Sequence, residues 1–185
     1  MARTAGRDRD ETRRLIVEAA TRLIARRGSA VPVADIAREA GVSKGGLLYH
    51  FASKEDLLVA VATDLFERFR GDVLAEAQAE PEGAPGRLTR AYVRVSFSDG
   101  ADEEGLRESI AVAAQLMHEP ALQRAAEADG ARWRADLLAD GLEASVVRVV
   151  VAATDGVSSA PLWGPVLDAD DRTALEAELV ALTRG

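Results

Sequence analysis

The sequence predicts an all-α protein. Aromatic residues make up only 4% of its 185 residues, alanine is abundant, and long stretches consist of residues that favour helices. Signals typical of strands are nearly absent. With 48% apolar residues the chain can bury a substantial core, either as one domain of average size or as two closely joined domains. We expect about nine helices.

Composition excludes several kinds of site. The chain has no cysteine, so it has neither a disulfide framework nor a thiolate metal site. Its two histidines, His50 and His118, are too few for an all-histidine metal site. No apolar run reaches 18 residues, so no helix is expected to span a membrane. Residues 1–14 are charged and lack the apolar centre of a signal peptide, which favours a cytoplasmic protein.

The first predicted helix covers about residues 10–27. Gly28 follows it, where a helix commonly ends. Residues 1 to about 9 are polar and aperiodic, and we expect them to form a short disordered arm. The helix has one apolar face at a period of 3.6 residues, formed by Leu15, Ile16, Ala19, Ala20, Leu23 and Ile24.

Two short helices joined by a tight turn are predicted between Val33 and Lys54. Ile36, Ala37 and Ala40 recur at helical spacing, and Gly41 can end the first helix in a left-handed conformation. Ser43 can cap the second helix, which covers about residues 44–50. Its core residues are expected to be Leu47, Leu48 and Phe51, although the face taken by Leu48 is open. This arrangement is typical of a helix-turn-helix.

The outward residues of the second short helix distinguish a DNA-binding element from an ordinary helical corner. Gly45 and Gly46 each cost about 1 kcal/mol relative to alanine in a helix. A helix that must approach a base edge or phosphate closely has a reason to carry both. The remaining outward residues are cations or hydrogen-bond donors, namely Lys44, Tyr49, His50 and Lys54.

Charge is divided unequally along the chain. The net charge is −8, which by itself argues against nucleic-acid binding. Residues 1–54, however, carry 11 Lys and Arg and 6 Asp and Glu, a net charge of +5, whereas residues 55–185 carry a net charge of −13. A basic N-terminal part fits a surface that faces phosphates, and a chance excess of arginine in a flexible tail is the alternative.

The stretch from Gly41 to Leu58, GVSKGGLLYHFASKEDLL, resembles the DNA-binding domain of TetR-family transcriptional regulators. The resemblance extends back to Thr12 and covers roughly the first third of the chain closely. It implies a homodimeric repressor that binds a palindromic operator in double-stranded DNA. Pro32 departs from the Thr or Ser that is usual there, and Gly46 stands where many relatives have Thr.

The resemblance assigns roles to individual residues of this sequence. Ser43 caps the recognition helix and reaches a phosphate, and Lys44 is the best candidate for a contact to guanine O6 and N7. Gly45 and Gly46 lie at the front of the helix in the major groove. The remaining contacts, to phosphates or a thymine methyl group, fall to Tyr49, His50 and Lys54.

The rest of the chain predicts six further helices. A long fourth helix begins near Ser53, which can cap it by a near-match to a capping box with Asp56, and ends near residue 79. A Pro- and Gly-rich loop at 81–86 separates it from helices at about 87–97, 103–117, 120–139, 143–160 and 168–183. We expect a kink or break at Gly130 and an interruption at Asp155-Gly156. The predicted domains are residues 1–54, for DNA binding, and 55–185, for ligand binding and dimerisation.

The final two helices look like the dimerisation end of TetR-like proteins, where two helices of each subunit form a four-helix bundle. A single intramolecular core is the alternative. The residues expected at the subunit interface are Val146, Val150, Ala153, Val157, Leu175 and Leu179.

A ligand pocket within the C-terminal domain is also implied by the resemblance, with a small apolar or amphipathic effector that releases the repressor. We expect Tyr92 and Gln115 to orient the ligand by hydrogen bonds. Several candidates have a structural alternative, since Phe97, Met117 and Trp133 suit a core and His118 can cap a helix end. The candidates are Tyr92, Phe97, Gln115, Met117, His118 and Trp133.

No catalytic constellation is apparent in the sequence. There is no nucleotide-binding glycine loop and no pair of metal ligands at helical spacing, so we expect neither an enzyme nor a cofactor or metal. A helical protein-interaction adaptor and a small helical enzyme remain as alternatives to the DNA-binding regulator. Activation instead of repression also stays open, because operator position decides it.

Overall fold

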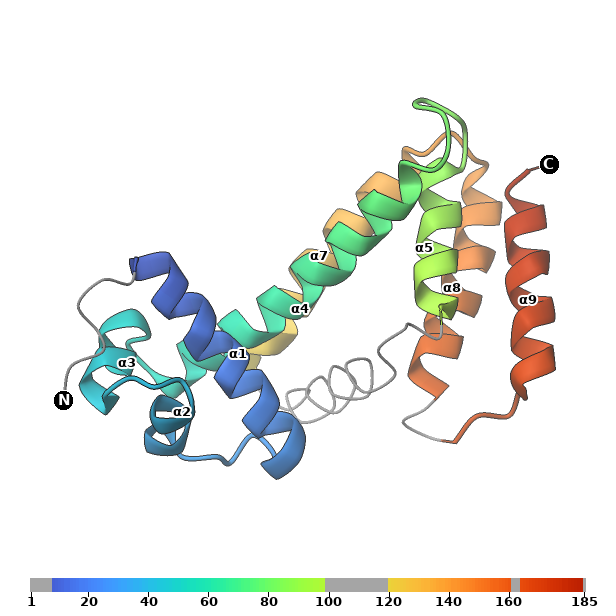
Figure 1. Cartoon of the computed structure of the whole chain (residues 1–185). Helices are drawn as coiled ribbons and strands as arrows, with labels where there is room; N and C mark the ends of the chain where they lie inside the picture. The colour runs from blue at the N-terminus through green and yellow to red at the C-terminus, as the bar shows by residue number, and fades with distance from the viewer. Residues whose placement is uncertain (1–7, 99–119, 161–163, 185) are drawn as a thin grey trace. The chain divides into compact units, whose positions relative to one another are not determined.

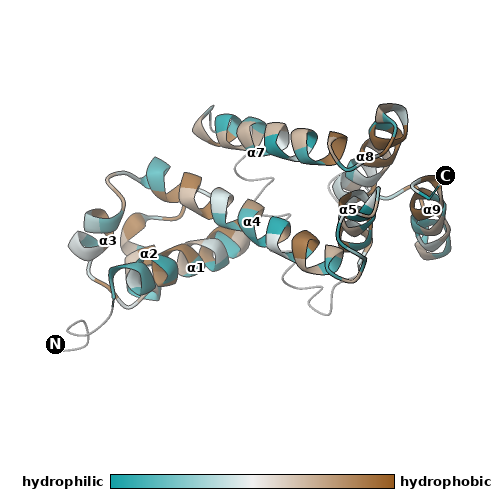
Figure 2. Ribbon diagram, turned by 90° about the horizontal axis from the view of Figure 1, so that it is seen from above, coloured by the Kyte–Doolittle hydropathy of each residue, from teal (hydrophilic) through white to brown (hydrophobic). Residues whose placement is uncertain are grey.

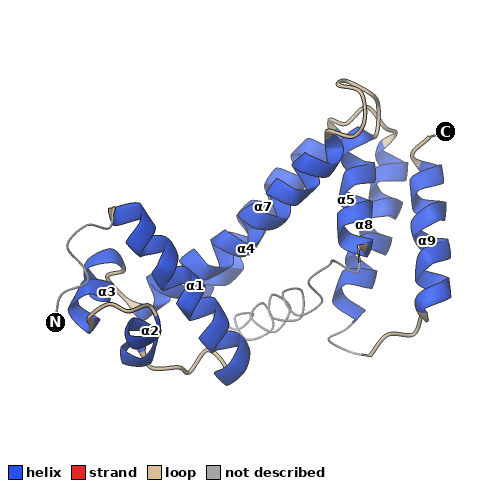
Figure 3. Cartoon of the chain, viewed as in Figure 1, coloured by secondary structure: helices blue, strands red, loops and turns tan. Residues whose placement is uncertain are grey.

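The computed structural model of the chain describes residues 8–98, 120–160 and 164–184. These residues form eight helices and contain no strand, which confirms the all-α prediction (Figures 1 and 3). The helix expected at 103–117 lies outside the described residues. The helices are α1 (Arg9–Arg27), α2 (Val33–Glu39), α3 (Lys44–His50), α4 (Lys54–Ala77), α5 (Arg87–Phe97), α7 (Pro120–Leu138), α8 (Ala144–Ser159) and α9 (Ala169–Leu182).

No helix break occurs at Gly130 or at Asp155-Gly156. α7 continues through Gly130, and α8 continues through Asp155-Gly156 to Ser159. Glycine inside a helix costs only about 1 kcal/mol, and burial of apolar side chains on both sides of it readily exceeds that cost. In α8 the buried Val150 and Val157 supply this burial.

The chain divides into two compact units, and α4 and α7 each contribute residues to both. Among the described residues, unit 1 contains 8–66 and 120–127, and unit 2 contains 67–98, 128–160 and 164–184. The predicted boundary between residues 54 and 55 stays a prediction, because compactness alone does not define an independently folding domain.

Unit 1 is built around the apolar face of α1. Ile16 and Ile24 are fully buried there, as are Ile36 of α2, Leu47 of α3 and Leu57 of α4. Full burial of each such side chain stabilises the fold by roughly 1.5–3 kcal/mol. This core therefore fixes the position of the short helix α3, which is too short to be stable alone.

Unit 2 contains α5, α8 and α9, and its core forms two clusters. One cluster joins Val73 of α4 and Leu137 of α7 to Val147 of α8. The other joins Val93 of α5 and Val150 of α8, both fully buried, to apolar residues of α9. Figure 2 shows hydrophobic residues along much of α8, which contributes buried residues to both clusters.

The buried side chain of Arg90 in unit 2 contacts the loop between α4 and α5 and the residue that follows α9. Arg90 of α5 is only 5% exposed, and its guanidinium donates to both carboxylate oxygens of Glu80. It also donates to the carbonyl oxygen of Pro85 at 3.0 Å and to that of Thr183 at 3.2 Å. The end of α9 is thus bound to the loop between α4 and α5.

Candidate DNA-binding interface

The turn between α2 and α3 has the conformation that the sequence predicts. Gly41 has a φ of +70°, in the left-handed region that other residues rarely adopt. The amide of Val42 donates to the carbonyl oxygen of Ala37 at 2.9 Å and closes the turn. Ser43 then caps α3, because its Oγ accepts a hydrogen bond from the amide of Gly46 at 3.0 Å.

The two faces of α3 are distinct. Leu47 is fully buried and Phe51 is 3% exposed, as predicted for core residues. The core assignment of Leu48 is wrong, since its side chain is 42% exposed. Leu47 and Phe51 are four residues apart and lie on one face of a helix, whereas Leu48 is rotated by about 100° from Leu47.

The predicted DNA contacts lie on the outward face of α3 or beside it. Ser43, Lys44 and Gly45 are exposed and Tyr49 is 70% exposed. Gly46 and His50 are half-buried, and so is Lys54 at the start of α4. Ser53 caps α4 through its Oγ, which accepts from the amide of Asp56 at 3.0 Å, as the near-match to a capping box predicts.

Two arginines of α1 lie beside this surface. The guanidinium carbon of Arg9 lies 5.6 Å from the centre of the Tyr49 ring, and Tyr49 meets His50 edge-on. Arg13 lies 4.8 Å from the centre of the Phe51 ring. The basic start of α1 was the available signal, but only the packing of α1 against α3 shows which arginines reach Tyr49.

Other arginines of unit 1 are engaged within the scaffold. Asp35 of α2 binds Arg27 of α1 at 3.0 Å and Arg38 at 2.7 Å, and Arg22 lies 3.7 Å from Glu39. These exposed pairs are each worth at most about 1 kcal/mol. Arg22, Arg27 and Arg38 thus bind carboxylates of α2, whereas Arg9 and Arg13 lie beside residues of α3 and its C-cap.

Two of the predicted ligand-binding residues lie together in unit 2. The rings of Tyr92 and Trp133 have centroids 5.1 Å apart, and Phe69 packs edge-on against both. Phe97 belongs to another core cluster, with Val93 and Leu179, and is 5% exposed. Three candidates, Gln115, Met117 and His118, lie outside the described residues.

Tyr92 has a firm hydrogen-bond partner. Its hydroxyl donates to Oδ1 of Asp155 at 2.7 Å. Burial raises the pKa of Tyr92 far above its usual value, and the hydrogen bond to Asp155 and the negative charges of Asp155 and Asp129 act in the same direction. Tyr92 is therefore a neutral hydrogen-bond donor at neutral pH.

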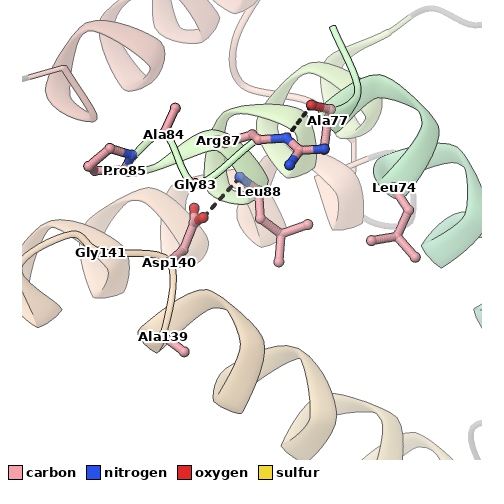
Figure 4. A pocket seen from close by; sticks show the side chains of 10 residues that line it. All are labelled: Leu74, Ala77, Gly83, Ala84, Pro85, Arg87, Leu88, Ala139, Asp140 and Gly141. Atoms are coloured by element: carbon pink, nitrogen blue, oxygen red, sulfur yellow. Dashed lines mark hydrogen bonds between the residues drawn. The ribbon is translucent and has the colours of Figure 1, made fainter. Parts of the chain in front are cut away.

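A cavity of about 370 Å³ lies elsewhere in unit 2, between the end of α4, the following loop and the end of α7 (Figure 4). Asp140 borders it and accepts hydrogen bonds from the amides of Leu88 and Thr89, which caps α5. Arg87 borders it as well and donates to the carbonyl oxygen of Ala77. Of the predicted ligand-binding residues that the structure describes, Tyr92, Phe97 and Trp133, none lines this cavity.

The residues predicted at a subunit interface differ in exposure. Val150, Val157 and Leu179 are buried in the core of unit 2, with exposed fractions of 0%, 7% and 2%. Val146, Ala153 and Leu175 are half-buried against that core. On α8 the exposed apolar residue is instead Val149, at 57%.

Comparison with known proteins identifies the family. Residues 16–61 match the family model described as bacterial regulatory proteins, tetR family. Residues 86–184, more than half of the chain, match the tetracyclin repressor-like C-terminal domain. The chain belongs to the TetR family. TetR-family proteins are DNA-binding transcriptional regulators.

Curated relatives agree with this assignment. The TetR-family chain is 31% identical over 109 residues to the HTH-type transcriptional regulator BetI of Escherichia coli O127:H6, covering 58% of this chain and 56% of BetI. It is 40% identical over 86 residues to BetI of Rhizobium meliloti, covering 46% and 41% of the two chains. The matched stretches thus span about half the length of these relatives.

Solved structures extend the likeness to the whole chain. The multidrug binding protein EbrR, complexed with imidazole, superposes with a TM-score of 0.72 at 27% identity, covering 99% of this chain and 97% of EbrR. EbrR complexed with ethidium gives 0.68 at 29% identity, over 95% and 99%. A TetR-family member from Streptomyces coelicolor A3 gives 0.71 at 28% identity, over 94% and 98%.

The described part of the chain has neither a candidate metal site nor a helix that could span a membrane. Residues 8–98, 120–160 and 164–184 contain no group of three or more His, Asp or Glu placed to hold a metal ion. No helix in these ranges is long and apolar enough to cross a membrane.

Proposed function

We propose that the chain is a homodimeric repressor that binds a palindromic operator through two copies of α3. The observation that carries this proposal is the outward face of α3, where Lys44, Gly45 and Tyr49 are exposed beside Arg9. Lys44 is exposed and forms no ion pair with another described residue, so its ammonium group is available to a base edge. The capped helix start and the half-buried Lys54 supply phosphate contacts.

A dimer would place the two α3 helices in successive major grooves of one face of the duplex, about 34 Å apart. The partner surface that the structure favours runs along the exposed side of α8, through Val149, Ala152 and Gly156. These residues recur at helical spacing and have small or apolar side chains. Val146, Ala153 and Leu175 are half-buried against the core that contains Val150, Val157 and Leu179.

A small amphipathic effector bound in unit 2 would release the operator. Support comes from the cluster of Phe69, Tyr92 and Trp133 and from the structural likeness to EbrR, a protein solved with ethidium and with malachite green. α4 and α7 contribute residues to both units, so a change in either helix can couple the effector to α3.

The deciding experiment is selection of bound duplexes from a random DNA pool by the full chain at two salt concentrations. We expect enrichment of a two-fold symmetric sequence, with affinity that falls steeply as salt rises. Lys44→Ala should weaken binding to that sequence by 1–3 kcal/mol, on the order of 10- to 100-fold, without changing the dimer. Weak binding without an enriched sequence would contradict the proposal and would favour a protein-binding role for α3.

A further inference from the structure

A guanidinium group covers the aromatic cluster of unit 2. The guanidinium carbon of Arg70 of α4 lies 4.1 Å from the centre of the Trp133 ring. The Trp133 ring in turn has its centroid 5.7 Å from that of Phe69 and 5.1 Å from that of Tyr92. The face of an indole ring attracts cations more strongly than that of any other side chain. Arg70 therefore occupies the position at which this cluster would hold a positive charge.

Arg70 is incompletely satisfied in that position. Its side chain is only 9% exposed, and its Nη1 donates to Asp136 at 2.6 Å. Its Nη2 lies 3.9 Å from Asp129, beyond hydrogen-bond distance, and neither Nη2 nor Nε has a hydrogen-bond partner among the described residues. A guanidinium has five N–H donors, and burying a charge with so few partners is costly.

The surroundings of the cluster carry an excess of negative charge. Asp129, whose side chain is 15% exposed, has a buried Oδ1 without a hydrogen-bond partner in the described part of the chain. Asp155 accepts from the Tyr92 hydroxyl, and Glu67 binds Arg132 at 2.6 Å. Asp129 also lies 3.9 Å from Arg132. Among the described residues that these contacts join, four carboxylates (Glu67, Asp129, Asp136 and Asp155) stand against two guanidinium groups (Arg70 and Arg132), which favours uptake of a further cation.

We propose that the effector is an organic cation and that Arg70 is a tethered competitor for its position. This inference rests on the proposed function, in which unit 2 binds an effector. The cation lies on the face of Trp133 with its charge against Asp129, and Arg70 withdraws toward solvent with Asp136. Asp136 can remain paired with Arg70 as Arg70 moves toward solvent, because the Asp136 side chain is already 46% exposed whereas that of Arg70 is 9% exposed.

The same arrangement selects among cations. A small, strongly hydrated ion cannot contact three rings and loses its hydration on entry, so it does not displace Arg70. A cation with delocalised charge and apolar surface loses less hydration and gains contact with Phe69, Tyr92 and Trp133. The site therefore takes bulky aromatic or quaternary cations in preference to metal ions or simple amines.

Tetraphenylphosphonium and tetraphenylborate test this inference, since the two ions share one shape and differ in the sign of their charge. Calorimetric titration of the full chain should show binding of the phosphonium and none of the borate. In a Trp163→Phe background Trp133 is the only tryptophan, and its fluorescence should change on binding. Equal binding of both ions, or binding without a change in Trp133 fluorescence, would overturn the inference.

Substitutions of Arg70 and of Asp129 should change the affinity for the phosphonium ion in opposite directions. Arg70→Leu removes the competitor and should tighten phosphonium binding by about tenfold, whereas Asp129→Asn should weaken it by about tenfold. If Arg70→Leu does not fold, as judged by circular dichroism, Arg70→Lys takes its place and should tighten binding severalfold because lysine competes less well for an aromatic face. Weaker or unchanged binding in a folded Arg70 variant would contradict the competitor role, since a merely structural arginine predicts that result.

Measuring operator affinity alongside phosphonium binding distinguishes failure of the cation site from failure of the proposed DNA-binding function. Phosphonium binding that leaves operator affinity unchanged would support the cation site and contradict effector release. Absence of phosphonium binding by a protein that still binds its selected operator would refute the cation site and leave the DNA-binding function intact.

Discussion

Gly45 and Gly46 are neighbours in α3 with different structural roles. A Cβ atom added at Gly46 would lie 3.2 Å from Oγ of Ser43, so a larger residue there disturbs the cap of α3. A Cβ at Gly45 would meet only the same Oγ, at an ordinary 4.0 Å, and the residue is exposed. The fold therefore explains Gly46, but nothing in the fold requires Gly45. We propose that close approach to DNA is the reason for a glycine at position 45.

Gly45→Ala should consequently separate stability from DNA binding. We expect the free energy of unfolding to rise by up to about 1 kcal/mol, because alanine favours the helix, while operator affinity falls at least severalfold. Chemical denaturation and a fluorescence-anisotropy titration with the selected operator measure the two effects. Gly71→Ala is the matched control, since Gly71 is an exposed glycine inside α4 with no atom within 4 Å of an added Cβ. An equal loss of affinity in both variants would refute the role of Gly45.

Arg9 gives a second prediction at the scale of a residue. It stacks on Tyr49 and carries its charge beside the outward face of α3, so Arg9→Gln should weaken operator binding for all sequences alike and lower the salt dependence by about one phosphate contact. Affinities measured at several salt concentrations test this. Arg38→Gln serves as the control, because Arg38 is held by Asp35 of its own helix. A change in sequence preference with an unchanged salt slope would contradict a phosphate contact by Arg9.

At the scale of the element, the ion pair between Glu80 and Arg90 joins the end of α9 to the loop after α4. The hydrogen bonds from Arg90 lower the pKa of Glu80 to about 2, although burial opposes them, and the charges of Arg90 and Arg94 act in the same direction. A carboxyl group whose pKa is lower in the folded state stabilises the fold above its unfolded-state pKa of 4.5. This stabilisation is lost as the pH falls from about 4.5 toward 2.

Glu80→Gln should therefore destabilise the protein at pH 7 and weaken its pH dependence between 4.5 and 2. We expect a loss of about 3 kcal/mol at neutral pH, because Arg90 is left buried without its carboxylate. Urea denaturation at intervals across this pH range measures both effects. Glu76→Gln is a suitable comparison, since Glu76 is more exposed and lies 3.4 Å from Arg94. A wild-type protein whose stability does not fall in this window would show that the pair contributes little.

Helices and turns were the part of the fold that local signals could predict. The bounds of α3 and α5 and the cap at Ser43 follow from residues close in sequence, because a helix end is decided by its own caps and turn residues. Leu48 was assigned to the wrong face, since a heptapeptide with two adjacent leucines does not show which one meets α1. The pairing of Arg9 with Tyr49 and of Arg70 with Trp133 joins positions far apart in sequence, so no local pattern could indicate it.

At the scale of the whole molecule, the proposed recognition of a palindrome depends on the proposed dimerisation through α8. Val149 is 57% exposed on a helix whose opposite side is buried, so Val149→Glu should disrupt a dimer without disturbing the core. We expect monomers in sedimentation-velocity experiments and a strong loss of operator affinity. Val166→Glu is the control, because Val166 is 96% exposed and lies outside the described helices. Dimers that persist in Val149→Glu would place the subunit interface on another surface.

The cap of α5 has a consequence for the order in which the molecule folds. Gly86 at its N-cap position has no side chain, and the amides of Leu88 and Thr89 are satisfied instead by the carboxylate of Asp140, more than fifty residues further along the chain. Such a cap exists only after a long loop has closed, at an entropic cost that local caps do not carry. Unit 1 obtains its caps from Ser43 and Ser53, each within three residues of the amide it accepts from. We therefore expect α5 to be completed late in folding, when the end of α7 arrives.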